Sequence, residues 1–233
     1  MALLSIVQDS CDIIGIPRPS TVAAATNTLT RQMFSMVNEI GRELTDAAPW
    51  QALTREKTHT TLAAELQGTI ASLMPGFHHK FYDTAWNRTQ IHFMGNPASA
   101  RGWQALKARS VSGPYYDWRY RQGNVYFYPT PTAGETVAWE YLTTYWCQSS
   151  GATDQSAFAA DTDVGVLDER LIKLGLIWRY KASKGLPYAE DFRIYESAKD
   201  TAIANDGGMA VLRDGCMNDS TFPVNMAEGS WNI

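Results

Sequence analysis

The sequence predicts an α+β protein in which helices at both ends of the chain enclose an aromatic-rich β segment. Apolar residues recur at helical spacing near both ends, and the centre is rich in aromatic and β-branched residues separated by short turns. Residues 209–233 have no period. We therefore expect a helical bundle formed by residues 1–50 and 160–208, an inserted β-sandwich or barrel module over 51–150, and an extended C-terminal tail over 209–233.

Two helices are predicted in the first 50 residues. Gly15 is placed to cap the first helix, and Pro17 prevents its continuation. The second helix is expected to end near residues 46–49. Neither helix can bury its apolar stripe alone, so both need partners elsewhere in the chain. The two stripes comprise Leu3, Leu4, Val7, Cys11 and Ile14, then Leu29, Met33, Met36, Val37, Ile40 and Leu44.

The central segment contains the predicted strands. Residues 55–62 are rich in threonine, and Gln122-Gly123-Asn124 is typical of a hairpin turn between strands at 115–122 and 124–128. Pro129 closes the second of these strands. Residues 136–146 predict a strand with aromatic side chains on both faces, which a second layer or another protein must cover. One short helix is expected near residues 97–108.

Two further helices are predicted after residue 160. Asp163 is the expected N-cap of the first, and Gly185-Leu186-Pro187 ends it. The last helix is expected to stop at Asp206-Gly207-Gly208, where the glycines are typical of a C-cap. The stripes comprise Val164, Leu167, Leu171, Leu174, Trp178 and Lys181, then Phe192, Tyr195, Ala198 and Ala202.

Composition excludes several classes of protein. The chain has 233 residues, a net charge of -4, 45% hydrophobic residues and only three cysteines, Cys11, Cys147 and Cys216. Such a chain has enough apolar surface to fold, and it is neither a disulfide scaffold nor a membrane span. Met1–Val7 lacks a basic region and Asp9 interrupts the apolar stretch, so we expect no signal peptide and a reducing cytoplasm.

The charge is unevenly distributed along the chain. Residues 1–49 carry -2, residues 50–150 carry +3 and residues 151–233 carry -5. A sequence-specific DNA-binding protein should show a clear positive excess on one element. We therefore expect no such function, although weak contact of the +3 segment with a nucleic-acid backbone stays open.

No motif predicts catalysis, a cofactor or a metal site. The histidines lie outside zinc motifs and are expected in polar loops or at helix starts, while Cys11 and Cys147 are expected in the core. Asp161-Thr162-Asp163 could chelate calcium but is better explained as the entry to a helix. The histidines are His59, His78, His79 and His92.

The 27 aromatic residues allow two interpretations. One is a stacking surface for carbohydrate or nucleotide that uses Trp118, Trp139 or Tyr141. The other, which we favour, is that the aromatics fill the core and the sheet faces.

An ordered set of short motifs resembles the bacteriophage head-to-tail adaptor proteins of the podoviral type, also called head-completion, tail-tubular or tail-accessory proteins. The matches are collinear over about residues 1–208. They comprise Asn38-Glu39, Gly41-Arg42-Glu43-Leu44, Trp50-Gln51-Ala52-Leu53, Leu73, Pro75 and Phe77, Trp86-Asn87-Arg88, Trp103, Tyr126, Tyr128-Pro129, Pro131 and Gly134, Glu140-Tyr141, Asp161-Thr162-Asp163, residues 167–172 and 178–181, Tyr188, Phe192 and Tyr195-Glu196.

The resemblance implies a non-enzymatic structural protein of the virion, assembled in the host cytoplasm. Such adaptors form a ring, typically of twelve copies, that joins the portal to the tail nozzle or tail tube, seals the filled head and passes DNA through its lumen. The C-terminal tail tends to reach the portal, and the β module tends to face the tail side. Candidate contacts of that C-terminal tail are Phe222, Val224, Trp231 and Ile233. The alternatives are a carbohydrate-binding module and a tail-associated hydrolase that uses His92 and a carboxylate.

Overall fold

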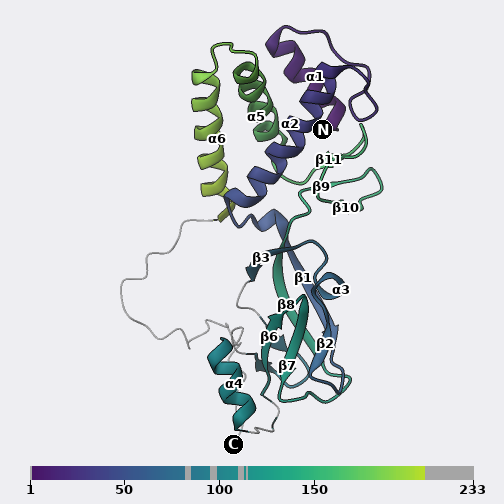
Figure 1. Cartoon of the computed structure of the whole chain (residues 1–233), viewed down its shortest axis with the longest axis vertical. Coiled ribbons are helices and arrows are strands. Elements are labelled where there is room, and N and C mark those ends of the chain that lie inside the picture. The colour runs from purple at the N-terminus through teal and green to yellow at the C-terminus, as the bar shows by residue number, and fades with distance from the viewer. Residues whose placement is uncertain (1, 82–84, 95–98, 110–112, 114, 208–233) are drawn as a thin grey trace, which may run out of the picture.

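The computed structural model describes residues 2–81, 85–94, 99–109, 113 and 115–207. These residues form six α-helices and antiparallel sheets, which confirms the mixed α+β class. The molecule is elongated (Figure 1), with most of the helices at one end and most of the strands at the other. Predictions about residues 208–233 fall outside the described part of the chain.

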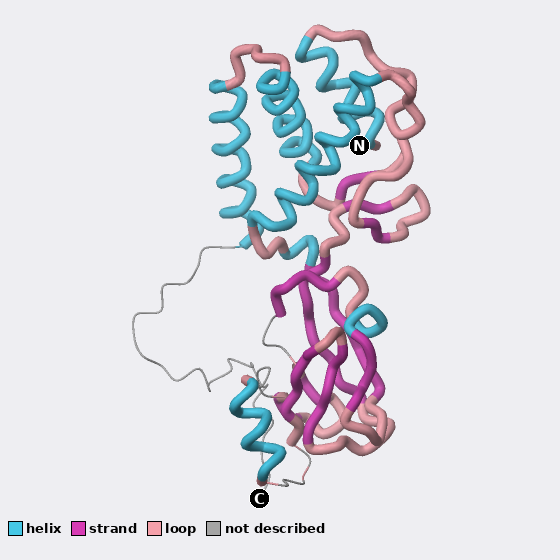
Figure 2. The backbone as a smooth tube through the Cα atoms, viewed as in Figure 1, coloured by secondary structure: helices cyan, strands magenta, loops and turns pink. Residues whose placement is uncertain are grey.

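Four long helices gather at one end of the molecule (Figure 2). They are α1 (Leu3–Ile14), α2 (Thr28–Ala47), α5 (Glu169–Ser183) and α6 (Ala189–Gly207); a 3₁₀ turn, η1 (Gln51–Leu53), follows α2. Gly15 caps α1 in the left-handed conformation at φ 81°, as predicted, because it has no Cβ to oppose that backbone. Asn27 caps α2 by accepting a hydrogen bond from the Leu29 N–H.

The start of α5 differs from the prediction. Its N-cap is Asp168, whose side chain accepts from the Arg170 N–H at 2.9 Å, and the segment Val164–Gly165 is a short strand instead of helix. Asp163 is buried and accepts from the N–H groups of Ala159 and Ala160 at 2.7 and 2.8 Å. The Asp163 carboxylate therefore closes a turn with the residues before it and does not accept from the N–H groups after it, as a helix N-cap would.

Two sheets form the other end of the molecule. In the first, β1 (Thr54–Thr60), β8 (Thr136–Thr143), β4 (Trp86–Asn87) and β5 (His92–Phe93) lie in that order, and β3 (Phe77–Phe81) also pairs with β8. In the second, β2 (Leu66–Thr69), β7 (Asn124–Tyr128) and β6 (Asp117–Arg121) lie side by side. The short helices α3 (Ile70–Leu73) and α4 (Ala100–Ala108) accompany them. We call this part the β region.

A third, small sheet lies beside the long helices (Figure 1). It consists of β10 (Asp154–Gln155), β9 (Cys147–Gln148) and β11 (Val164–Gly165). Together with α1, α2, α5 and α6 it forms what we call the helical region. Within the described residues, no helix is long and apolar enough to cross a membrane.

The predicted hairpin at residues 122–124 is confirmed. Strands β6 and β7 pair with Arg121 opposite Asn124, which leaves Gln122 and Gly123 as the two central residues of the turn. Their φ angles of 49° and 73° are both positive, as a type I′ turn requires.

Strand β8 is shorter than predicted and is aromatic on one face only. Val137, Trp139 and Tyr141 point into the β region, while Leu142 belongs to the core of the helical region. The chain leaves the sheet after Thr143, and Trp146 is fully buried among the helices. The expectation of aromatic side chains on both faces of a strand over residues 136–146 is therefore wrong.

Each region has its own hydrophobic core. The helical core includes Trp146 and Phe158 in addition to helix residues, and the β core includes Phe127 and Trp139. Segments from both ends of the chain build most of the helical core, together with Leu53, Leu142, Trp146 and Cys147 from the central segment, which also builds the β core. The division into domains at residues 50, 150 and 160 stays a prediction.

Candidate interaction surfaces

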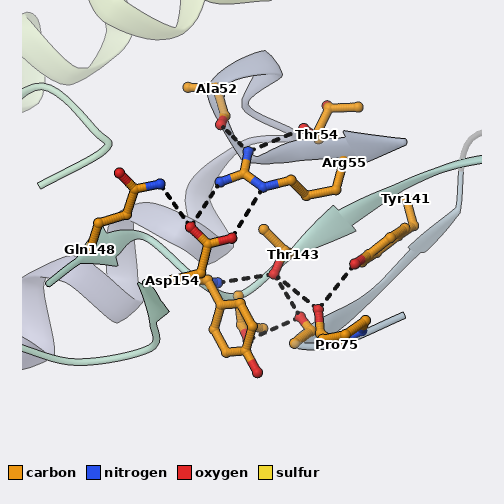
Figure 3. Close-up of polar contacts among 11 residues, drawn as sticks. Ala52, Thr54, Arg55, Pro75, Tyr141, Thr143, Gln148 and Asp154 are labelled. Carbon is orange, nitrogen blue, oxygen red and sulfur yellow. Dashed lines mark hydrogen bonds and ion pairs between the residues drawn. The ribbon is translucent and has the colours of Figure 1, made fainter. Parts of the chain in front are cut away.

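A polar junction joins the two regions (Figure 3). The guanidinium of Arg55 on β1 lies 3.4 Å from both carboxylate oxygens of Asp154 on β10, and it also donates to the carbonyls of Ala52 and Thr54. Gln148 donates to Asp154 at 2.8 Å. Burial alone would raise the pKa of Asp154, but the hydrogen bonds from Gln148 and Arg55 and the charge of Arg55 hold that pKa below its usual value. The junction therefore favours an ionised carboxylate.

Further contacts lie at or near the junction. His78 on β3 lies 2.8 Å from the carboxylate of Asp46 on α2. Asp206, near the end of α6, accepts from the Gln51 N–H at 2.6 Å. Within the β region, the Tyr141 hydroxyl donates to the Pro75 carbonyl at 3.2 Å, and burial raises the pKa of Tyr141. Because the Arg55–Asp154 and His78–Asp46 contacts join the regions at two separate places, the junction restrains bending in more than one direction.

Two of the histidines do not lie where the sequence predicted. His78 and His92 are on strands β3 and β5, not in loops or at helix starts. His59 lies on β1, within the strand predicted near residues 55–62, and the side chain of His79 lies outside the described residues. The ring of His92 stacks on Tyr115 with a centroid distance of 4.5 Å. Over the described part of the chain, no group of three or more His, Cys, Asp or Glu residues could hold a metal ion.

The two described cysteines are core residues, as predicted. Cys11 on α1 and Cys147 on β9 are fully buried. Burial raises the pKa of both thiols, that of Cys147 to about 12. Neither thiol is therefore an activated nucleophile. Cys216 lies outside the described residues.

Asp161 holds the loop between α1 and α2 by hydrogen bonds. It neither begins a helix nor belongs to a metal site. It accepts from the Thr21 hydroxyl at 2.6 Å and from the N–H groups of Val22 and Ala23 at 2.9 and 2.7 Å. Burial acts to raise its pKa, but these three hydrogen bonds outweigh burial and lower it. Asp161 thus ties the loop between α1 and α2 to the segment before α5.

The three aromatic residues considered for a stacking surface are buried. Trp118, Trp139 and Tyr141 are each only 5% exposed and belong to the β core. A carbohydrate- or nucleotide-binding surface made of these three residues is therefore wrong, and the interpretation of the aromatics as core holds for them. The candidate portal contacts Phe222, Val224, Trp231 and Ile233 lie outside the described residues.

One end of the helical region exposes an apolar patch, which we call the helical pole. Leu186, Tyr188 and Phe192, at the turn between α5 and α6, are exposed. The ring of Trp178 lies beneath them, with centroid distances of 6.4 Å to Tyr188 and 5.1 Å to Phe192. Because α6 begins here and ends at the junction, this patch lies at the far end of the helical region (Figure 1).

The opposite end of the molecule exposes two large apolar side chains, which we call the β pole. Ile91 and Tyr115 are 77% and 67% exposed, the highest values among the large apolar side chains that the structure describes. The loop before Ile91 is tied to Thr136, at the start of β8, while the other end of β8 adjoins the helical core. The two poles therefore face away from each other along the molecule.

The β region also carries spare basic charge. Among the described residues, Arg101 and Arg109 on α4 and Arg119 and Arg121 on β6 form no ion pair, and the guanidinium of Arg121 lies 4.9 Å from the ring centre of Tyr126. This placement agrees with the +3 charge of residues 50–150.

Sequence reasoning missed both poles. Phe192 matched a helical stripe, which favours burial, and Tyr188 lay just before that stripe. Ile91 is an isolated apolar residue in a polar turn, so periodicity gives it no weight. A lone isoleucine between turn residues is the one signal that could have identified it.

No protein-family model matches this chain, and a search of curated proteins found no match. The case for a function therefore depends on the molecule's own surfaces.

Proposed function

We propose that this chain is a non-enzymatic head-to-tail adaptor of a bacteriophage virion. In this proposal a helical bundle formed by both ends of the chain, an inserted β-sandwich module and an extended C-terminal tail make one subunit of a homo-oligomeric ring, a dodecamer by resemblance. The ring binds the portal on one side and the tail nozzle or tail tube on the other. It seals the filled head, and DNA passes through its lumen without specific binding.

One observation carries the proposal: an elongated subunit exposes apolar patches at opposite ends. Monomeric proteins rarely expose contiguous apolar patches without a partner to cover them. Leu186, Tyr188 and Phe192 are exposed at one end, and Ile91 and Tyr115 are exposed at the other. A connector must bind two different proteins at once, and two separated patches support that task.

The junction supports the same function. A connector must hold its two binding ends in a fixed relation, and the ion pair between Arg55 and Asp154 resists bending between the regions. The contact of His78 with Asp46 and that of Asp206 with Gln51 act at other points of the same junction.

No specific observation favours the alternatives. The aromatic residues named for carbohydrate stacking are buried. His92, the base considered for a hydrolase, packs against the ring of Tyr115 at a tilt of 31°.

The test is direct binding to the portal protein of the same phage. We expect the full chain to form rings on purified portal, seen by size-exclusion chromatography and negative-stain images. By resemblance the β module faces the tail side, which leaves the helical pole for the portal side, so Tyr188→Ser with Phe192→Ser should reduce ring formation at least about tenfold. The matched control is Ile13→Ser, which removes an exposed isoleucine from α1 and should have no effect. If the wild-type chain does not bind portal, the proposal is wrong.

A truncation tests the C-terminal tail. Removing residues 215–233 should weaken portal attachment and leave the helical circular dichroism signal unchanged. Unchanged attachment would exclude the tail as the anchor.

A further inference from the structure

Ile91 is held in a conformation that its side chain disfavours. Its φ angle is 56°, in the left-handed region, where a β-branched residue is a clear outlier. The same side chain is 77% exposed to water. Both features oppose the stability of the isolated chain. An isoleucine at this position therefore points to a contact outside the chain.

The loop that carries Ile91 is braced by buried polar side chains. The side-chain oxygen of Asn87 accepts from the N–H groups of Thr89 and Gln90, each at 3.1 Å. The Asn87 amide donates to one carboxylate oxygen of Glu135 at 2.7 Å, and the Gln90 amide donates to the other at 3.0 Å. Asn87 and Glu135 are almost completely buried, so solvent does not compete for these bonds.

Strand β8 holds the loop from its other side. The Thr136 N–H donates to the Thr89 hydroxyl at 2.8 Å, and the Arg88 N–H donates to the Thr136 carbonyl at 2.8 Å. Strained backbone persists only where the surroundings over-determine it, and these contacts do so. The loop therefore projects Ile91 in one fixed direction, with little entropy left to lose on binding.

The surroundings of Ile91 define the chemistry of its partner. Residues 89–94 contain no Asp, Glu, Lys or Arg, and the His92–Tyr115 stack adds a second apolar surface. Arg88 is paired with Glu56, and Glu140 lines the same groove as Ile91, so the charge beside the loop is acidic. The complementary surface is therefore apolar where it meets Ile91, with no acidic group facing Glu140. A lipid surface is a poorer match, because interfacial anchors combine several apolar residues with basic ones.

We propose that Ile91 is a pre-formed apolar anchor that inserts into an apolar pocket of a protein partner at the β pole. That partner is the tail nozzle or tail tube protein, an assignment that rests on the proposed adaptor function. Anchors of this kind dominate binding when they are rigid before the complex forms.

The experiment separates binding from stability at one position. Ile91→Asn removes the apolar side chain and introduces a residue that tolerates positive φ. We expect it to raise the Tm of the full chain by about 3 °C. The affinity of the portal-bound ring for purified nozzle protein, measured by biolayer interferometry, should fall at least about tenfold. Ile91→Val, which keeps a branched apolar group, should bind nozzle within about threefold of wild type.

Ile13→Asn is the matched control. It also replaces an exposed isoleucine, but in the ordinary helical backbone of α1. Asparagine is the poorer helix former, so this variant should lower the Tm slightly and leave nozzle binding unchanged.

Each outcome decides the proposal. If the wild type binds both portal and nozzle and Ile91→Asn binds nozzle equally well, the anchor is wrong and the adaptor function stands. If Ile91→Asn abolishes self-association of free chain or binding to phosphatidylglycerol vesicles while nozzle binding persists, the proposed partner is wrong. If the wild type binds neither portal nor nozzle, the adaptor function fails and the anchor assignment fails with it.

Discussion

The helical region and the β region are packed in opposite ways. In the helical region, a Cβ added at Gly41 would lie 2.2 Å from the ring of Trp146, and one added at Gly175 would lie 2.9 Å from Ile40. The β core instead encloses a small apolar cavity, lined by Met74, Ala85, Met94, Trp118, Val125, Phe127, Val137 and Trp139. The helical core has no room for a methyl group at Gly41 or Gly175, whereas the β core leaves a small empty space among its apolar side chains.

This difference shows that the two regions achieve rigidity by different means. In the helical region, close approach of backbone and rings fixes the helices. In the β region, hydrogen bonds of buried Asn87 and Glu135 fix the loop that carries Ile91, although the core nearby is less dense. A tight core is thus not required for a rigid binding loop.

The largest expected effect is at Gly41. Gly41→Ala forces the Trp146 ring to move and should lower the free energy of unfolding by about 3 kcal/mol. Urea denaturation followed by circular dichroism measures this. Gly151→Ala is the control, since a Cβ there meets nothing closer than the Ser149 hydroxyl at 3.8 Å. Equal stability of the two variants would remove the contrast between the regions.

In the β core, adding a methyl-sized group should raise the free energy of unfolding instead of lowering it. Val137→Ile adds one methylene group beside the cavity and should raise the free energy of unfolding by about 1 kcal/mol. The same urea titration measures it, followed by tryptophan fluorescence. A loss of more than about 1 kcal/mol would mean that the β core is as tightly packed as the helical core.

At the junction, we expect a pH-dependent effect. The pKa of Asp154 is lower in the folded chain than its usual value near 4, so its stabilisation is present above about pH 5 and is lost as pH falls through the lowered pKa. Asp154→Asn should therefore lower stability by about 1 kcal/mol at pH 7 and by much less at pH 3. Asp200→Asn, an exposed change on α6, should show no such dependence. A pH-independent loss at Asp154 would assign it a packing role instead.

The smallest effect concerns thiol labelling, which tests how tightly the helical region is closed at two places. In a Cys216→Ser chain, Cys11 reports on the helical core and Cys147 on the small sheet near the junction. Because burial raises both pKa values, labelling by a maleimide at pH 8 should be at least about a hundredfold slower than in urea. Mass spectrometry of the peptides gives each rate. Fast labelling of native Cys147 would contradict its burial.

Local signals in the sequence predicted much of the secondary structure. Gly15 and Pro17 located the end of α1, and Gly123 located the hairpin, because a cap or a turn depends on a few adjacent residues. Asp163 was misassigned because a carboxylate that accepts N–H bonds is equally suited to a helix start and to a turn. The difference lies in which N–H groups come near, and spacing alone does not contain that information.

The candidate surfaces were beyond local reasoning. The sequence allowed Trp118 and Trp139 to be exposed for stacking, but both are buried between the two sheets. The helical stripe favoured burial of Phe192, but its side of α6 is exposed. Exposure is a property of the whole packing arrangement, so no window of sequence determines it.

By itself, the sequence determined the α+β class, the ends of several helices and the excess of positive charge in the middle of the chain, since these follow from composition and short-range periodicity. Only the tertiary structure decided that Trp146 packs on Gly41, that Arg55 meets Asp154, and that Ile91 stands exposed at positive φ. Those facts depend on contacts between residues far apart in the chain, and such contacts form only when the helices and sheets pack together.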